Sequence, residues 1–242
     1  DKLSKKLKEY DVHYAMRYQN PSIEKEIDKI LLKNPDEITV LPLFPHYASA
    51  TTGSVFEEIS RIMSKKWVVP KINFISQFYD NERFIEAWLE KASKFDLNDF
   101  DKIIFSYHGI PISHVDNVYP NSLCSDHDCE KQITDANKFC YKATTYETTK
   151  IIADKLNISS DKYIVSYQSR LFGKWLTPFT KDGHENVLIF SPAFTADCLE
   201  TIIELGDEYK ELFEENGGKN LDYVRSLNYS DLWVDAIIDI IK

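Results

Sequence analysis

The stretch NVLIFSPAFTADCLET, residues 186–201, decides the fold. Its first five residues, Asn186 to Phe190, are apolar and partly β-branched, which predicts a buried parallel strand. From Leu199 the pattern predicts a helix that continues to residue 215 and packs its apolar side chains against the sheet. A strand that leads into a helix is the repeating unit of α/β folds, so Glu200 is expected just past the C-terminal end of a strand.

Three glutamates follow this strand at a regular spacing: Glu200, Glu204 and Glu208. On an α-helix, residues at i, i+4 and i+8 share one face and lie one turn apart. A solvated helix face is the more common meaning of such a charge run. The other interpretation is a row of hard oxygen ligands for a divalent metal, and the position of Glu200 at a strand end favours it.

The same alternation extends along the chain and predicts an α/β fold with parallel sheets flanked by helices. Helices are expected over 1–10, from Pro21 onward, and over 54–65, 81–94, 142–156 and 230–241. Strands are expected over 12–18, 37–43, 71–75, 102–107 and 163–167. Ser54 to Glu57 has the form of a capping box at a helix start. The polar segment 116–139 interrupts this pattern, and connections of that length are usually functional.

Composition narrows the classes of function. A net charge of −10 and the absence of a basic stripe argue against a nucleic-acid partner. No apolar run reaches the roughly 20 residues of a membrane span, so we expect a cytoplasmic protein with at most peripheral membrane contact. Three of the four cysteines (Cys124, Cys129, Cys140, Cys198) cluster in the sequence, which favours a reducing compartment and a metal over a disulfide framework. Because the chain begins at Asp1 inside a predicted helix, we expect an N-terminally truncated fragment.

Ligands of parallel α/β sheets bind at the C-terminal ends of the strands. Among the residues predicted there, His108 precedes a glycine and is a candidate base or metal ligand together with Glu200, although a lone histidine is more often structural. The guanidinium of Arg17 suits a carboxylate, or else forms a surface ion pair. The ring of Trp175 could stack on a flat ligand, although such rings usually pack in the core.

Five stretches in order and register together resemble the ferrochelatase family. They are Arg17-Tyr18, Pro45-His46-Tyr47 through Thr51-Thr52-Gly53-Ser54, Ser106-Tyr107-His108-Gly109-Ile110-Pro111, Tyr167-Gln168-Ser169-Arg170 with Trp175-Leu176-Thr177-Pro178, and Pro192-Ala193-Phe194 through Cys198-Leu199-Glu200-Thr201. The resemblance covers nearly the whole chain and implies insertion of Fe²⁺ into protoporphyrin IX, giving protohaem and two protons. It also implies two Rossmann-like halves with the porphyrin cleft between them, the first half being incomplete here.

The resemblance assigns roles to residues that match the family's motifs. His108 and Glu200 would be catalytic and would contact the Fe²⁺ substrate, with His108 acting as base, metal ligand or both. The acidic row continues to Glu204 and Glu208 as a delivery path for the metal. The porphyrin cleft would include Arg17, Tyr18, Tyr141 and Trp175.

The resemblance implies no required cofactor, Fe²⁺ being a substrate. Some bacterial relatives carry ligands of a two-iron, two-sulfur cluster in an insertion, which makes Cys124, Cys129 and Cys140 candidate ligands. We do not favour a cluster, because Glu130 stands where those relatives have a further cysteine and a cluster takes four ligands.

We expect residues 1–45 and the C-terminal segment 222–242 to form the first half. Residues 46–221 would form the second half, with an insertion at about 116–139. The alternatives are a chelatase for another tetrapyrrole, such as coproporphyrin III or a cobalt-accepting precorrin-type ring, and a non-catalytic tetrapyrrole- or metal-binding relative. The sequence does not indicate an oligomeric state.

Overall fold

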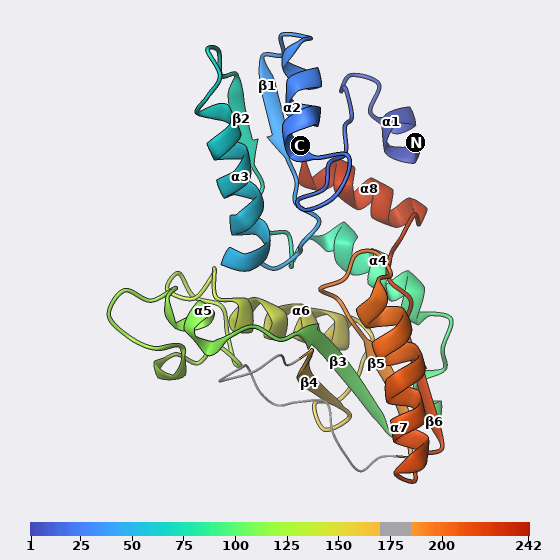
Figure 1. Ribbon diagram of the computed structural model, residues 1–242. Coiled ribbons are helices and arrows are strands. Elements are labelled where there is room, and N and C mark those ends of the chain that lie inside the picture. Colours follow the sequence, from blue (N-terminus) through green and yellow to red (C-terminus); the bar gives the residue numbers. More distant parts are fainter. Residues whose placement is uncertain (170–184) are drawn as a thin grey trace.

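The structure, a computed structural model, describes residues 1–169 and 185–242. Its parallel strands flanked by helices confirm the predicted α/β architecture (Figure 1). In chain order the elements are α1 (Lys2–Lys6), α2 (Ile23–Leu31), β1 (Glu37–Val40), η1 (Ser49–Gly53), α3 (Ser54–Met63), β2 (Lys71–Phe74), α4 (Glu82–Ala92), η2 (Leu97–Asp99), β3 (Lys102–His108), α5 (Ile112–Asp116), η3 (Cys124–Asp126), α6 (Tyr141–Lys155), β4 (Tyr163–Gln168), β5 (Asn186–Phe190), η4 (Glu200–Glu208), α7 (Tyr209–Glu215), β6 (Asn220–Tyr223) and α8 (Asp231–Ile240).

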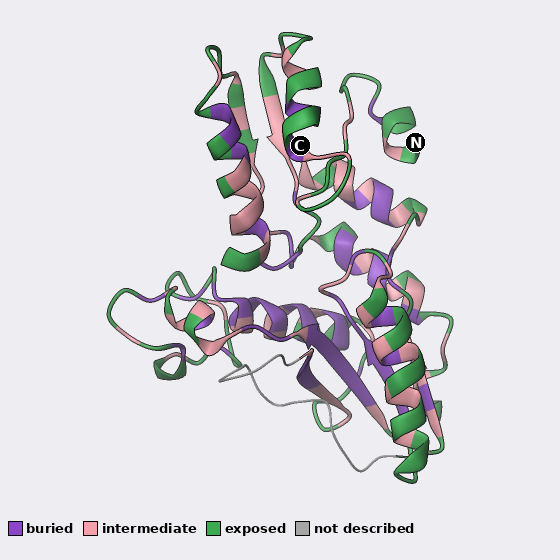
Figure 2. Ribbon diagram, viewed as in Figure 1, coloured by how far each residue is buried: buried purple, intermediate pink, exposed green. Residues whose placement is uncertain are grey.

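The larger sheet of the described residues is parallel and has the strand order β4-β3-β5-β6. Side chains alternate across it, as the period of a strand requires. Ile103 and Phe105 of β3 face a core built with α4, α6 and α8. Ile104 faces the opposite side, where Leu205 of η4 covers the sheet. Because both faces are covered, the centre of this sheet is buried, as Figure 2 shows.

The smaller sheet pairs β1 with β2 in parallel, Glu37 opposite Lys71 and Val40 opposite Phe74. Helices α2 and α3 share one apolar cluster with it, around Ile27 and Ile62. In Figure 1 this layer lies at the top and the larger sheet below, with α4 and α8 between them.

The strand pairing crosses the expected boundary between the two halves at residue 45. β1 precedes this residue and β2 follows it, so the sheet groups residues 54–74 with the first layer rather than the second. At the other end of the chain, α8 packs on α4 through Trp233, whose ring centroid lies 5.9 Å from that of Phe84. Lys2 of α1 forms an ion pair with Asp231 of α8 at 2.9 Å, which brings the two termini to the same side of the molecule.

Two expectations near the N-terminus are wrong. Residues 12–18 form no strand, because their one ladder contact in the described structure is an isolated bridge between Met16 and Ser22. A strand needs a neighbour for its backbone groups, and sequence pattern alone does not supply one. The capping box at Ser54 is also absent: the helical chain already begins at Ser49, and the Ser54 hydroxyl instead accepts a hydrogen bond from Arg17.

The segment 199–215 is helical, as predicted, but it is not a single type of helix. It begins as the π-helix η4 and becomes an α-helix only at Tyr209. A spacing of i, i+4 does not distinguish i→i+4 from i→i+5 hydrogen bonding, so the sequence could not separate the two. The short elements α5 and β6 were not predicted. Within the described ranges, no helix combines the length and the apolarity that crossing a bilayer requires.

Candidate active site

His108 is the last residue of β3 and pairs in register with Gln168 at the end of β4. It therefore lies at the C-terminal edge of the larger sheet, as predicted. Its Nδ1 lies 2.7 Å from the carbonyl oxygen of Gly109. A carbonyl oxygen can only accept, so this bond places the proton on Nδ1 and leaves Nε2 as the acceptor or ligand atom.

Tyr141 supports His108 from the core. Its side chain is buried, and its hydroxyl donates a hydrogen bond of 2.9 Å to the backbone carbonyl of His108. From the sequence, Tyr141 is expected in the porphyrin cleft, and this stays a prediction. Its hydrogen bond to the chain itself holds the end of β3 at His108.

Glu200 is the first residue of η4 and is half-buried. Its pKa lies below the ordinary value, chiefly because the Cys198 thiol donates a hydrogen bond to the carboxylate, while the electrostatic interaction with His108 acts in the same direction and burial opposes both. Burial and the bond to Glu200 raise the pKa of Cys198 to about 11, so the thiol keeps its proton at neutral pH. An ionised Glu200 is thus held within electrostatic reach of His108.

The segment that carries Glu200 is fixed by Asp197, which the sequence analysis did not single out. One carboxylate oxygen accepts from the backbone amide of Ser226 at 3.0 Å, and the other accepts from the Asn228 amide at 3.0 Å and from Arg225 at 3.3 Å. Burial alone would raise the pKa of Asp197, but these donors lower it overall. The charged carboxylate therefore ties the Glu200 segment to the connection between β6 and α8.

The three glutamates differ in exposure along η4. Glu200 and Glu204 are half-buried, whereas Glu208 is exposed. Glu204 is held at both oxygens, by Ser169 at 2.7 Å and by Tyr209 at 3.1 Å. A solvated helix face would not need such anchoring, so the contacts of Glu204 favour a defined position for its carboxylate.

Arg17 and Tyr18 lie in the other layer, beside the start of α3. The Arg17 Nε donates to the hydroxyl of Ser54 at 2.9 Å and to its carbonyl at 3.2 Å. The guanidinium lies 4.7 Å from the centroid of the Tyr18 ring, which is 80% exposed. Trp175 and Arg170, named from the sequence, lie outside the described residues.

A layer of buried hydroxyl groups lies beneath the site, and it too was not predicted from the sequence. Helix α6 carries four buried threonines: Thr144, Thr145, Thr148 and Thr149. Thr149 bonds the hydroxyl of Tyr107 at 2.8 Å, and Thr148 bonds Nε2 of His46 at 2.9 Å. Burial lowers the pKa of His46 to about 3, so this imidazole is neutral. The i, i+1, i+4, i+5 spacing of the threonines, which shares one helix face, is the signal that could have revealed the layer.

Cys124, Cys129 and Cys140 come together in the core, with their sulfur atoms within 4.8 Å of one another. A two-iron, two-sulfur cluster normally takes four thiolates, two on each iron. The described residues bring three sulfur atoms into mutual contact, and Cys198 lies beside Glu200 instead. Glu130 forms an ion pair with Lys142 at 2.5 Å. This donor set does not fit such a cluster.

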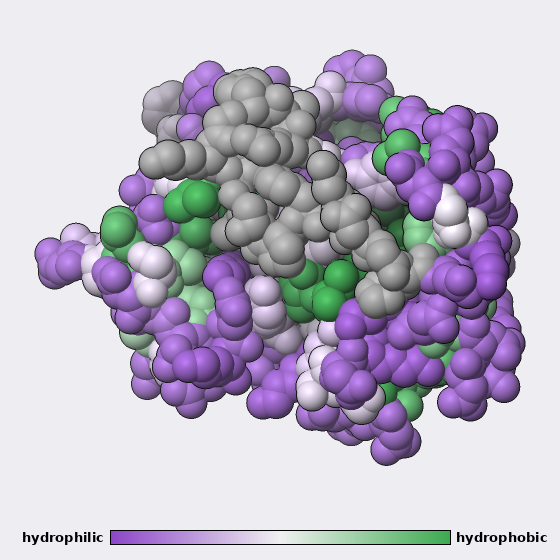
Figure 3. All heavy atoms as spheres, turned by 90° about the horizontal axis from the view of Figure 1, so that it is seen from below, coloured by the Kyte–Doolittle hydropathy of each residue, from purple (hydrophilic) through white to green (hydrophobic). Residues whose placement is uncertain are grey.

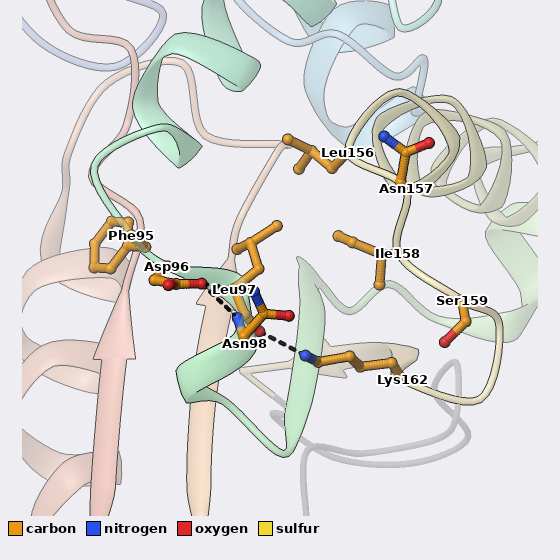
Figure 4. Close-up of a pocket in the computed structure, with 9 residues that line it drawn as sticks. All are labelled: Phe95, Asp96, Leu97, Asn98, Leu156, Asn157, Ile158, Ser159 and Lys162. Carbon is orange, nitrogen blue, oxygen red and sulfur yellow. Dashed lines mark hydrogen bonds between the residues drawn. The ribbon is translucent and has the colours of Figure 1, made fainter.

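A surface hollow of about 660 Å³ lies away from these residues (Figure 4). It is lined by segments around Asn98 and Asn157, and Lys162 crosses it to donate to the carbonyl of Leu97 at 2.6 Å. These residues precede β3 and β4, so the hollow is at the N-terminal edge of the sheet, opposite His108. On the lower face of the molecule, hydrophilic residues dominate the margins and hydrophobic residues reach the surface nearer the middle (Figure 3).

Comparison with known proteins identifies the family. The family model described as Ferrochelatase matches residues 1–242. The chain belongs to the ferrochelatase family. It is 35% identical to a ferrochelatase of Idiomarina loihiensis over 96% of its own length and 36% identical to one of Legionella pneumophila over its whole length. It spans 61% and 74% of those two proteins.

Two further matches bear on substrate and fold, one to a curated protein and one to a solved structure. A coproporphyrin III ferrochelatase of Lactococcus lactis is 36% identical to the chain. The match covers 97% of this chain and 69% of that protein. The structure of SirB from Bacillus subtilis with Fe³⁺ matches 99% of this chain and 85% of that one, with a TM-score of 0.63 at 12% identity. At this identity the match shows a shared fold and nothing about the site.

Proposed function

We propose that the protein to which this chain belongs is a ferrochelatase that inserts Fe²⁺ into protoporphyrin IX and releases two protons. One observation carries the proposal: in a chain of this family, the Nε2 acceptor atom of His108 and the ionised carboxylate of Glu200 occur together at the C-terminal edge of the larger sheet. That edge is where parallel α/β sheets bind their ligands.

His108 acts as the proton acceptor in this proposal. Its Nδ1 proton is held by the Gly109 carbonyl, so Nε2 can take a proton from a pyrrole nitrogen. The imidazole then becomes positively charged, and the nearby negative charge of Glu200 stabilises it. Tyr141 keeps the strand end in place by its bond to the His108 carbonyl.

Glu200, Glu204 and Glu208 form the proposed delivery path for the metal. Carboxylates bind hydrated divalent ions without the firm retention of thiolates. Each oxygen of Glu204 accepts one hydrogen bond from the chain, and a carboxylate oxygen has two lone pairs, so both oxygens can still bind a metal. Exposure that increases from Glu200 to Glu208 gives the path an outer end in solvent.

The proposal also specifies which porphyrin is the substrate. Relatives of about equal identity include a coproporphyrin III ferrochelatase, so identity does not separate the two porphyrins. A chelatase that accepts cobalt, or a protein that binds porphyrin without turnover, would give a different result in a metallation assay. That the protein needs no cofactor, binds no nucleic acid and is cytoplasmic stays a prediction.

The test is an anaerobic metallation assay of the full-length protein with Fe²⁺ or Co²⁺ and with protoporphyrin IX or coproporphyrin III in parallel. We expect turnover with Fe²⁺ and protoporphyrin IX that is lost in His108→Ala. The matched control is His13→Gln, which removes an imidazole paired with Asp11 and Glu26 in the other layer. Porphyrin binding without metallation would contradict the proposal. Preferential turnover of coproporphyrin III would show that this porphyrin, and not protoporphyrin IX, is the substrate.

A further inference from the structure

The three core cysteines form a compact group of sulfur atoms. The Sγ atoms of Cys124 and Cys129 are 3.7 Å apart, those of Cys124 and Cys140 are 3.7 Å apart, and those of Cys129 and Cys140 are 3.9 Å apart. All three side chains are buried, at 6%, 2% and 0% exposure. They come from η3, from the connection that follows it, and from the residue that precedes α6.

The size of this triangle matches the coordination shell of one metal ion. Zinc–thiolate bonds are about 2.3 Å long, and a tetrahedron with such bonds has edges of about 3.8 Å. A two-iron cluster would separate the thiolates into two pairs, whereas here all three sulfur–sulfur distances lie between 3.7 and 3.9 Å. We propose that Cys124, Cys129 and Cys140 bind a single thiophilic divalent cation, with Zn²⁺ the preferred ion.

The surroundings fit a closed structural site. The sulfur atoms belong to the main apolar core, and the Tyr119 hydroxyl lies 3.1 Å from Cys129 Sγ, so an oxygen donor stands beside the group. The ring of His127 stacks on Tyr119 with a centroid distance of 4.0 Å and covers this side. Binding converts the thiols to thiolates and releases their protons to solvent, and no redox change is involved.

The site would connect the insertion to His108. Cys124 and Cys129 belong to the irregular segment between α5 and α6, and Cys140 directly precedes Tyr141. The Tyr141 hydroxyl in turn holds the His108 carbonyl. One bound ion would therefore fix a long loop against the helix that supports the end of β3. The ion is distinct from the metal substrate, so this inference does not depend on the proposed activity.

The experiment titrates Co²⁺ into the reduced, metal-free full-length protein and records thiolate-to-cobalt charge-transfer absorption. We expect saturation at one Co²⁺ per chain, displacement by Zn²⁺, and a higher melting temperature with Zn²⁺. Cys129→Ser should abolish the absorption. The matched control Cys198→Ser should retain it, because Cys198 lies beside Glu200 and outside the group.

The opposite pattern, loss in Cys198→Ser and retention in Cys129→Ser, would place the thiolate–metal contact at Glu200 and overturn the inference. About two irons and two sulfides per chain after anaerobic purification would overturn it in favour of a cluster. X-ray absorption spectroscopy of the zinc-loaded wild-type protein is a second test, and it does not depend on whether the variants fold. A zinc shell with three sulfur neighbours supports the site, and a shell of nitrogen and oxygen alone contradicts it.

Discussion

The two parallel sheets differ in how deeply their strands are buried. In β3, five consecutive residues from Ile103 to Tyr107 are buried, whereas β1 and β2 contain no buried residue (Figure 2). The larger sheet has apolar clusters on both faces, one with α4, α6 and α8 and one with η4 and α7. The smaller sheet has one cluster, with α2 and α3, and exposes Lys71 and Asn73 on the other side.

This difference bears on where chemistry can be positioned. Side chains at the end of a strand covered on both faces are held by packing as well as by backbone hydrogen bonds. His108 and Glu200 belong to the larger sheet and its covering helix, while Arg17 and Tyr18 border the smaller one. We therefore expect the reacting groups to depend on the first region and substrate approach to depend on the second.

The largest expected effect is on stability. Phe105→Ala removes a fully buried ring that stacks on Phe190 at 5.0 Å, and should lower the free energy of unfolding by about 3–5 kcal/mol. The matched change in the smaller sheet, Phe74→Ala, removes a half-buried ring and should cost less than about 2 kcal/mol. Urea unfolding of both variants measures the difference, and equal losses would contradict the comparison.

The next effect is on catalysis by the full-length protein. His108→Ala should lower metallation at least about a hundredfold while porphyrin binding persists, a loss typical of a positioned acid–base group. Arg17→Ala, in the other region, should mainly raise the apparent KM for porphyrin, because Arg17 is expected to bind rather than to react. Steady-state kinetics with porphyrin titration separate the two. A larger fall in kcat for Arg17→Ala than for His108→Ala would reverse the assignment.

The three glutamates extend the comparison within the larger region. Glu200→Gln should lower kcat and kcat/KM for both iron and zinc by about tenfold, because it removes the charge beside His108. Glu208→Gln should mainly raise the apparent KM for the metal, and Glu204→Gln should fall between the two. Metal titrations of the three variants measure this order. Three nearly silent changes would support a solvated helix face, and equal effects of Glu200→Gln and Glu208→Gln on kcat would rule out a graded path.

The smallest effect is the pH dependence of stability, which should have opposite signs in the two regions. His13, near α2, has its pKa raised by the bond to Asp11, with Glu26 contributing and burial opposing. Its contribution should be complete below about pH 6.5 and lost as the pH rises through the raised value. Asp197 has a lowered pKa, so its contribution should be complete above about pH 3.8 and lost as the pH falls through the lowered value.

Urea midpoints of His13→Gln and Asp197→Asn, each compared with wild type across the pH range, test these signs. The difference between wild type and His13→Gln should shrink towards alkaline pH, and the difference for Asp197→Asn should shrink towards acid pH. A difference that shrinks in the other direction for either variant would contradict the contacts of that residue.

Local pattern was sufficient for much of the fold. The apolar runs at 102–107, 163–167 and 186–190 correspond to β3, β4 and β5, and His108 stands at a strand end as expected. These features depend on side-chain periodicity and on neighbours in sequence, which a chain displays without folding. The strand predicted at 12–18 is absent because its local pattern was suitable but did not supply a partner. Among the described residues, no neighbouring strand pairs with it.

The contacts that position the site join residues far apart in sequence. Ser169 reaches Glu204, Asp197 reaches Asn228, and Tyr141 reaches the carbonyl of His108. In the same way, β1 pairs with β2 across the expected boundary at residue 45. The sequence by itself predicted which residues could carry the chemistry, and His108 stands at the strand end that it indicated. Only the tertiary structure decided what holds them and that three cysteines meet in one core, because non-local packing selects these partners and no local period encodes it.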